Sequence, residues 1–327
     1  MHSPVNNFTR QYQYPPYEES IPTMKIVAVL MMVVAFSDVM TPRHLWGKSP
    51  VEWVDPLIDT HASRWFFFNS ASRPFALVNL SPDTSTKGSW DSGYLYGEKY
   101  IRCFSPVMPI VGEMTGPQGM DAYQSEFTHD EEVVGAGHHK VLLKKYGITA
   151  ELTSTLRTGF HRYTFPETED AYILFDVGAY LGHGPMVKAE VDKVSDTEIE
   201  GMSLQEKTGR RRKRTPVFFV AQFSQPMTQF GGWRNGQLSE PAESIEGEET
   251  GAFVRFETTE GTPVLMRVGI SYTSMEGARR NLQAELAHWD FDQVVEDSKH
   301  DWNEHLSRIE VEGGSDAQKT KFYTDLW

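Results

Sequence analysis

The stretch Ala150-Glu-Leu-Thr-Ser-Thr-Leu-Arg-Thr-Gly-Phe-His-Arg-Tyr-Thr-Phe-Pro166 contains two short runs, residues 150–154 and 159–165, that are rich in strand-forming residues. Only four residues separate the two runs, and a proline follows the second. Short runs with turn residues between them are typical of antiparallel β-structure, in which one strand folds back beside the last.

Similar runs lie on both sides of this stretch. Glycine and proline recur every few residues from about position 51 to position 185, and no regular alternation of strands with helices is visible. Many short strands separated by turns predict a mainly β chain, folded as an antiparallel β-sandwich. The further runs are residues 76–80, 140–143, 171–177, 217–223, 253–257 and 264–272.

The pattern changes at Ser274. Residues 276–286 lack proline and repeat apolar residues every four positions, which predicts a helix, and a second helix is expected to begin near Asp290 as its N-cap. Residues 308–312 alternate like a strand, and residues 315–327 read as the start of another helix. Because the chain stops inside that helix, we expect a truncation there.

Length and composition exclude several classes of protein. The 327 residues can bury a large core, and 39% hydrophobic with 12% aromatic residues is a globular composition. The lone Cys103 excludes a disulfide framework and a multi-cysteine zinc site. The net charge of −14 makes a nucleic acid a poor partner. The basic run at residues 210–214 is expected to be a solvated hairpin loop, with a nuclear signal or a processing site as alternatives.

Residues 1–50 differ from the rest and read as a leader. Met24 and Lys25 precede an apolar run at residues 26–36, followed by the small residue Ser37, which is the pattern of a signal peptide. A buried strand or helix is the alternative. The run is too short to span a bilayer, which takes about 20 residues, so we expect no stable membrane span and a secreted, periplasmic or extracellular protein.

Several short motifs resemble functional sites but do not support one. The glycines from Gly178 to Gly184 follow a predicted strand but do not open a helix, so they indicate a tight turn rather than a dinucleotide site. Adjacent His138 and His139 would point to opposite faces of a strand and seldom reach one ion. No Gly-x-Ser-x-Gly or His-Glu-x-x-His motif occurs.

Two loops have the composition of a sugar site. Residues 87–96 and residues 59–70 combine aromatic side chains with short polar ones, and sugars need flat apolar faces beside hydrogen-bonding groups. The alternative is that Trp65, Phe68 and Trp90 with their aromatic neighbours belong mostly to the core.

A series of segments resembles, in order, the N-terminal domain of glycoside hydrolase family 92, the calcium-dependent exo-α-mannosidases. The resemblance covers roughly residues 51–327. Its most specific segment is the stretch at residues 150–166 quoted above. The other matching segments are residues 54–58, 74–84, 90–96, 268–274 and 302–314.

The resemblance implies a large antiparallel sandwich of the galactose-mutarotase-like supersandwich type at residues 51–273. A two-helix linker at residues 274–306 and the start of an (α/α)₆ catalytic barrel at residues 307–327 would follow. The rest of that barrel is absent from this sequence and is the expected intramolecular partner. The resemblance also implies inverting hydrolysis of mannose-containing glycans with calcium, whose ligands are expected mostly outside this chain.

We therefore assign no catalytic carboxylate, although Asp91, Glu98 and Glu113 are available. The substrate-binding residues implied by the resemblance are Trp90, Asp91, Phe68, Asn69 and Ser70, which would form one wall of the sugar pocket. The chain departs from the family at two points. Residues 59–61 and Ala76 replace glycines of the family pattern, and the chain runs from Ser105 straight to Pro106 where the family has a pocket loop.

Two other functions remain open at this point. A stand-alone carbohydrate-binding sandwich would need no barrel and would have no catalytic activity. A surface interaction protein would present an exposed apolar patch, for which Leu326 and Trp327 are candidates.

Overall fold

The computed structural model of the chain describes residues 47–61, 68–86, 92–179, 185–209 and 211–327. The chain divides into two compact units, Met1–Gly47 and Lys48–Trp327, and the account below concerns the second. The predicted leader and its signal peptide lie outside the described residues. No helix among the described residues is both long enough and apolar enough to cross a membrane.

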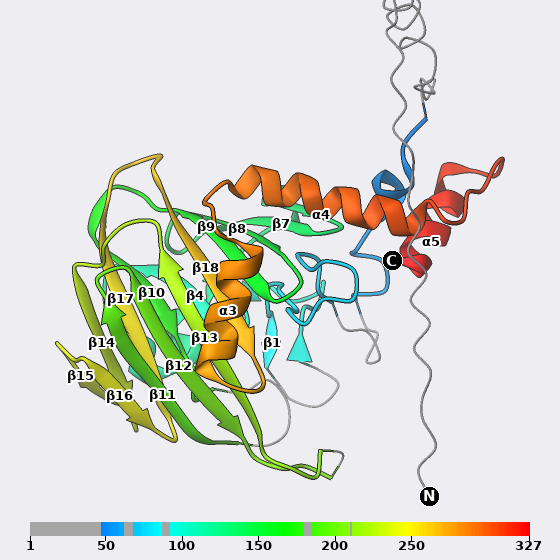
Figure 1. Cartoon of the computed structure of the whole chain (residues 1–327). Coiled ribbons are helices and arrows are strands. Elements are labelled where there is room, and N and C mark those ends of the chain that lie inside the picture. The colour runs from blue at the N-terminus through cyan, green and yellow to red at the C-terminus, as the bar shows by residue number, and fades with distance from the viewer. Residues whose placement is uncertain (1–46, 62–67, 87–91, 180–184, 210) are drawn as a thin grey trace, which may run out of the picture. The chain divides into compact units, whose positions relative to one another are not determined.

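Within the described residues, the larger sheet has nine antiparallel strands in the order β16-β11-β12-β13-β18-β9-β8-β7-β6 (Figure 1). The strands are β6 (Glu132–Gly135), β7 (His138–Leu143), β8 (Ile148–Ser154), β9 (Thr158–Thr164), β11 (Met186–Ser195), β12 (Glu198–Gln205), β13 (Thr215–Phe223), β16 (Ser244–Gly247) and β18 (Pro263–Ser271). The stretch at residues 150–166 contains most of the β8–β9 pair, with Ser154 opposite Gly159.

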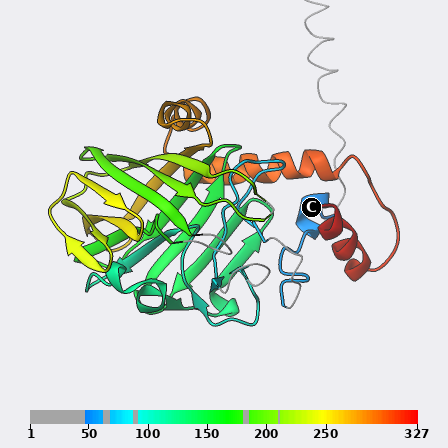
Figure 2. The same ribbon diagram turned by 90° about the horizontal axis from the view of Figure 1, so that it is seen from below.

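A second sheet, of five strands in the described part of the chain, has the order β15-β14-β17-β10-β4. Its strands are β4 (Val107–Val111), β10 (Thr168–Phe175), β14 (Gln229–Arg234), β15 (Gln237–Ser239) and β17 (Thr250–Thr258). The hydrophobic core joins the two sheets: Phe175 of β10 stacks on Phe219 of β13 with ring centroids 6.0 Å apart. The predicted antiparallel sandwich is therefore confirmed (Figure 2).

Two predicted strands are wrong. Residues 76–80 bury Val78 and Leu80 alternately, but they join no sheet, because the N–H groups of Leu77 and Val78 both bond to the carbonyl of Leu156. Residues 308–312 are also irregular. Their backbone bonds instead to the hydroxyl of Tyr323, which lies 3.4 Å from the Val311 nitrogen.

The helices are at the predicted places. Helix α3 (Met275–Glu285) begins after the N-cap Ser274 and packs on the outer face of β13 and β18. Helix α4 (Phe291–Leu306) begins after the predicted N-cap Asp290, whose side chain accepts from the Gln293 N–H, and it packs against β8.

The last helix, α5 (Asp316–Leu326), begins after Ser315 in a capping box. It packs on the short helix η1 (Pro50–Trp53), and the Asp55 N–H donates to the Thr324 hydroxyl at 3.0 Å. Residues at the two ends of this unit are therefore in contact.

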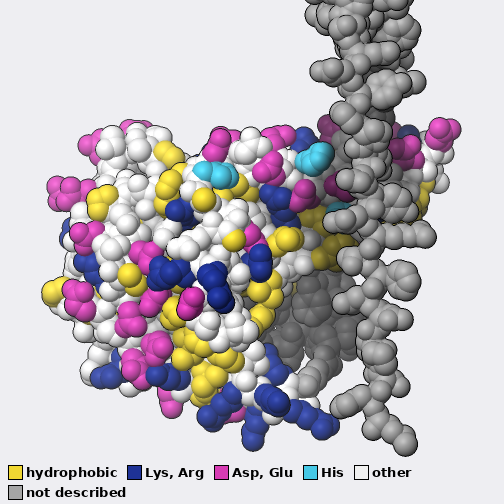
Figure 3. All heavy atoms as spheres, viewed as in Figure 1, with side chains coloured by type: hydrophobic (Ala, Val, Ile, Leu, Met, Phe, Trp, Pro, Cys, Tyr) yellow, Lys and Arg dark blue, Asp and Glu magenta, His cyan; other side chains and the backbone are white. Residues whose placement is uncertain are grey.

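Acidic and basic side chains are interspersed over the face shown in Figure 3, and lysines and arginines gather at its lower edge. The β12–β13 hairpin ends there, with Gln205 opposite Thr215 and with exposed Arg212, Lys213 and Arg214 near its tip. The prediction of a solvated hairpin loop for the basic run is confirmed for the residues that the structure describes.

Candidate functional site

The two loops predicted to form a sugar site meet through their aromatic side chains. Phe68 stacks on Tyr94 with ring centroids 4.3 Å apart and an interplanar angle of 22°. Tyr94 directly follows β2 (Ser92–Gly93), which pairs with β1 (Ser85–Thr86). Both rings are buried, so this contact joins the described ends of the two loops. The predicted site residues Trp90 and Asp91 lie outside the described residues.

A buried polar network continues beneath this aromatic pair. The Ser70 hydroxyl lies 2.8 Å from His139 Nδ1, and His139 Nε2 lies 2.9 Å from Glu132 Oε1. Ser70 and His139 are both 0% exposed. The order Ser–His–Glu has the composition of a nucleophilic triad. No substrate could reach this serine, however, so the arrangement holds the loop in place.

Glu132 is the centre of the network. The Tyr94 hydroxyl donates to Glu132 Oε2 at 2.9 Å, and His129 Nδ1 lies 2.7 Å from the same oxygen. Burial alone would raise the pKa of Glu132, but the contacts with His139, His129 and Tyr94 outweigh it and lower that pKa. Burial lowers the pKa of His139 against the pull of Glu132, which favours a neutral ring.

One member of this network, His129, also lines a cavity of about 770 Å³, which we call the His61 cavity. The His129 ring stacks on Tyr96 with centroids 3.9 Å apart, and His129 Nε2 lies 3.0 Å from the Tyr96 carbonyl oxygen. Glu98, one of the carboxylates left unassigned by sequence, lines the same cavity. The cavity therefore has an aromatic wall beside charged groups.

Asn69 faces a different cavity, of about 440 Å³, together with Arg73, Trp302 and Trp327. The Asn69 side-chain amide donates to Asn79 Oδ1 at 3.1 Å. Phe75 lines the rim, is 92% exposed and has a backbone φ of 57°, a value that non-glycine residues seldom adopt. The three described site residues thus divide: Phe68 and Ser70 are buried supports, and Asn69 is at the surface.

A buried carboxyl lies at Ser105, where the resemblance predicts that a pocket loop is missing. Asp83 Oδ2 accepts from the Ser105 N–H at 3.0 Å and from the Ser105 hydroxyl at 2.9 Å. Burial raises the pKa of Asp83 to about 6. From Ser105 the chain passes directly into β4, and Cys103 beside it is buried. Sequence reasoning marked this point but gave Asp83 no role.

Calcium has no assigned ligand in this structure. Among the described residues no three His, Cys, Asp or Glu side chains are grouped so that they could hold one ion. Glu113, another available carboxylate, is exposed on the segment after β4.

Residues 53–271 match the glycosyl hydrolase family 92 N-terminal domain, and residues 277–327 match the family 92 catalytic domain. No curated protein sequence matches the chain.

Solved structures give the same fold. The family GH92 α-mannosidase BT3965 from Bacteroides thetaiotaomicron is 24% identical, with a TM-score of 0.79 over 86% of this chain and 41% of that one. The inverting mannosidase BT2199 from the same organism is 23% identical, with a TM-score of 0.76 over 86% of this chain and 40% of that one. The chain thus spans about two fifths of the length of the structures it matches. On the match across residues 53–271, the chain belongs to glycoside hydrolase family 92, of which it carries the N-terminal sandwich domain.

Proposed function

We propose that this chain is the N-terminal sandwich part of a secreted α-mannosidase-type glycoside hydrolase that acts on mannose-containing glycans. Its sandwich would supply one wall of the sugar pocket. Two successive family 92 domains match along the chain in the expected order, which supports the proposal. A structure of BT3965 holds mannoimidazole, so a relative of the same fold binds a mannose-like ligand.

The observation that carries the proposal is the contact of Phe68 with Tyr94, supported by the Ser70–His139–Glu132 network. A binding wall works best when the residues that touch the ligand are held by others that are already packed. In our proposal Trp90 offers a flat face to the sugar, and Asp91 and Asn69 offer polar groups. Phe68 and Ser70 hold the loop from beneath.

The reaction proposed for the whole enzyme is inverting hydrolysis. One carboxylic acid protonates the leaving oxygen while a carboxylate, about 6.5–9.5 Å away, activates a water on the opposite face of the sugar. We assign both groups and the calcium ligands to the catalytic domain. The sandwich residues position the ring so that this attack can occur.

The test is a nuclear magnetic resonance titration of the ¹⁵N-labelled chain with methyl α-D-mannopyranoside. We expect the indole N–H of Trp90 and the side-chain amide of Asn69 to shift, and Trp90→Ala to remove the Asn69 shift. Trp289→Ala is the matched control, because Trp289 lies under Arg267 just before α4 and belongs to neither loop. If the sugar shifts neither Trp90 nor Asn69, the pocket-wall proposal is wrong.

A stand-alone carbohydrate-binding module is the second candidate. The His61 cavity favours it, because the Tyr96–His129 stack gives a single domain an aromatic wall of its own. This function predicts sugar affinity by calorimetry that falls when Tyr96 becomes Ala and is unchanged when Trp90 becomes Ala. Sugar affinity that falls in Trp90→Ala and is unchanged in Tyr96→Ala would instead favour the pocket-wall function.

A further inference from the structure

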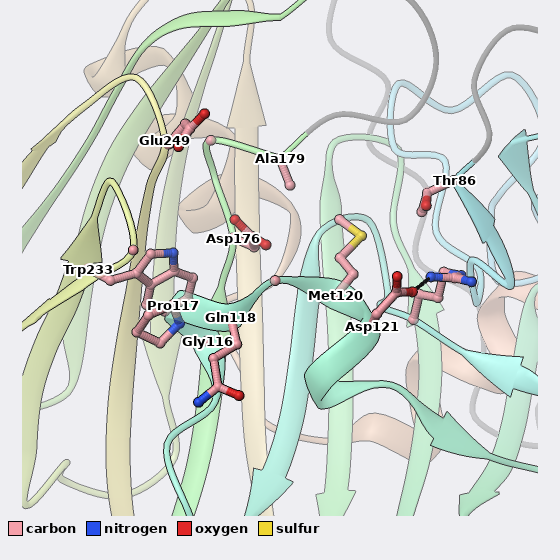
Figure 4. A pocket seen from close by; sticks show the side chains of 14 residues that line it. Thr86, Gly116, Pro117, Gln118, Met120, Asp121, Asp176, Ala179, Trp233 and Glu249 are labelled. Atoms are coloured by element: carbon pink, nitrogen blue, oxygen red, sulfur yellow. Dashed lines mark hydrogen bonds and ion pairs between the residues drawn. The ribbon is translucent and has the colours of Figure 1, made fainter.

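A cavity of about 460 Å³ lies at the carboxyl end of β10, facing the short helices η2 (Gly116–Gln118) and α2 (Met120–Tyr123) (Figure 4). We call it the Asp176 cavity. None of Phe68, Asn69 and Ser70 lines it. Its volume falls within the range of about 300–1,000 Å³ that is usual for small-molecule sites.

A buried carboxyl group forms part of its wall. Asp176 is 8% exposed, and its Oδ2 accepts from the hydroxyl of the fully buried Tyr123 at 2.7 Å. Burial raises the pKa of Asp176 to about 6. In the described structure no Lys, Arg or His ion pair compensates this carboxyl, so a ligand that donates hydrogen bonds would be favoured there.

The surrounding walls are rigid and partly apolar. Trp233 is held between two glycines, since a Cβ added at Gly116 or Gly251 would approach its ring within 2.5 Å or 2.0 Å. Figure 4 shows its indole nitrogen on the side where Asp176 lies. Met120 and Pro117 contribute apolar surface to the same cavity. The cavity thus offers apolar surface close to a hydrogen-bond acceptor.

Charge decides which ligand fits. Asp121, Asp176 and Glu249 line the cavity with Arg102 as the opposing cation, and Arg102 is already paired with Asp121. Anionic ligands would meet uncompensated carboxylates and be repelled. Hydroxyl groups can donate to Asp176, and the C–H face of a sugar ring can lie on Met120.

We propose that the Asp176 cavity binds a neutral pyranose, with hydroxyl groups that donate to Asp176 and a C–H face that packs on Met120 and Pro117. The site depends on residues of this chain alone. It can therefore be tested on the full 327-residue chain without the rest of the enzyme.

The experiment is calorimetric titration of the chain with methyl α-D-mannopyranoside, chosen because the proposed function concerns mannose. Asp176→Asn removes the charged acceptor and keeps the shape, and we expect the dissociation constant to rise at least about tenfold. Asp170→Asn is the matched control on the same strand β10, because Asp170 pairs with Arg255 and does not line the cavity. It should bind like the unmodified chain.

A second variant covers the case in which Asp176→Asn does not fold. Ala179 lines the cavity, and its replacement by Phe would fill part of the space while keeping the carboxyl group of Asp176 in the chain. We expect Ala179→Phe to abolish binding while far-ultraviolet circular dichroism stays unchanged.

Absence of binding overturns the proposal, and so does binding that survives both Asp176→Asn and Ala179→Phe. Loss of binding only in Trp90→Ala would place the sugar at the pocket wall. That outcome would overturn this inference and support the proposed function.

Discussion

The ring of Phe68 lies 4.3 Å from that of Tyr94, 26 positions further along the sequence, and stacks on it, which joins the two loops. The Tyr94 hydroxyl then reaches Glu132, and Glu132 reaches His139 and Ser70. The same few side chains therefore hold both loops that are proposed to face the sugar.

Removal of the Tyr94 hydroxyl should weaken this support. Tyr94→Phe keeps the ring on Phe68 but takes one donor from the buried Glu132, so we expect the free energy of unfolding to fall by about 1–3 kcal/mol. Urea denaturation measures the change. Tyr100→Phe is the control, because that exposed tyrosine also donates to a glutamate, Glu126, but in water. If both variants lose equally little stability, the Tyr94 hydroxyl is not needed to stabilise the buried Glu132 carboxylate.

The buried Asp83 makes stability depend on pH. Its folded-state pKa of about 6 lies above the usual aspartate value of 3.8, so the folded state keeps this proton to higher pH than the unfolded state does. The free energy of unfolding therefore loses up to about 3 kcal/mol from this group as the pH rises from about 4 to 7.

Asp83→Asn should remove that loss. Relative to the unmodified chain, the variant should gain stability as the pH rises through this range in parallel urea titrations. Parallel pH profiles for the two proteins would show that Asp83 is not the cause.

The packing of Trp233 can be tested through a glycine. Gly251→Ala would put a methyl group within 2.0 Å of the Trp233 ring, and overpacking of this kind costs about 1–3 kcal/mol. Gly135→Ala in β6 is the control, because no other atom lies within 4 Å of the added Cβ. Thermal unfolding compares them. A Gly251→Ala variant as stable as the control would mean that Trp233 moves freely.

Arg73 joins the sandwich to helix α4. Its guanidinium pairs with Asp301, and its Nε donates to the Ser154 carbonyl at 3.1 Å. Arg73→Gln should lower the free energy of unfolding by about 1–2 kcal/mol and speed amide exchange in α4. Arg280→Gln breaks an exposed pair with Glu276, which should cost under about 1 kcal/mol. Unchanged exchange in α4 would contradict this role of Arg73.

The sequence was informative where a single element decides its own structure. The β8–β9 pair follows from its residue types, and α4 starts just after Asp290 because an aspartate can cap the helix. The sequence wrongly predicted a strand at residues 76–80, because alternate burial of side chains does not by itself make a strand. The N–H groups of Leu77 and Val78 find their acceptor on a loop, at Leu156.

The site was predictable only in part, because its residues come from distant parts of the sequence. The aromatic loops were visible in the sequence, but His139 lies 69 positions from Ser70, and only folding joins them. Glu132 follows the polar residues His129, Asp130 and Glu131, yet it starts β6 with a side chain that is 1% exposed. The alternation of His138 and His139 along a strand was the one available sign that His139 could be buried.

The most direct test of the account is the hydrolysis of 4-nitrophenyl α-D-mannopyranoside by the purified 327-residue chain, with calcium and with a chelator. A family 92 mannosidase assayed under the same conditions is the positive control. Because we assign the acid, the base and the calcium ligands to the catalytic domain, we expect this chain to release no nitrophenol above background. Calcium-dependent turnover by this chain, lost on chelation, would contradict it.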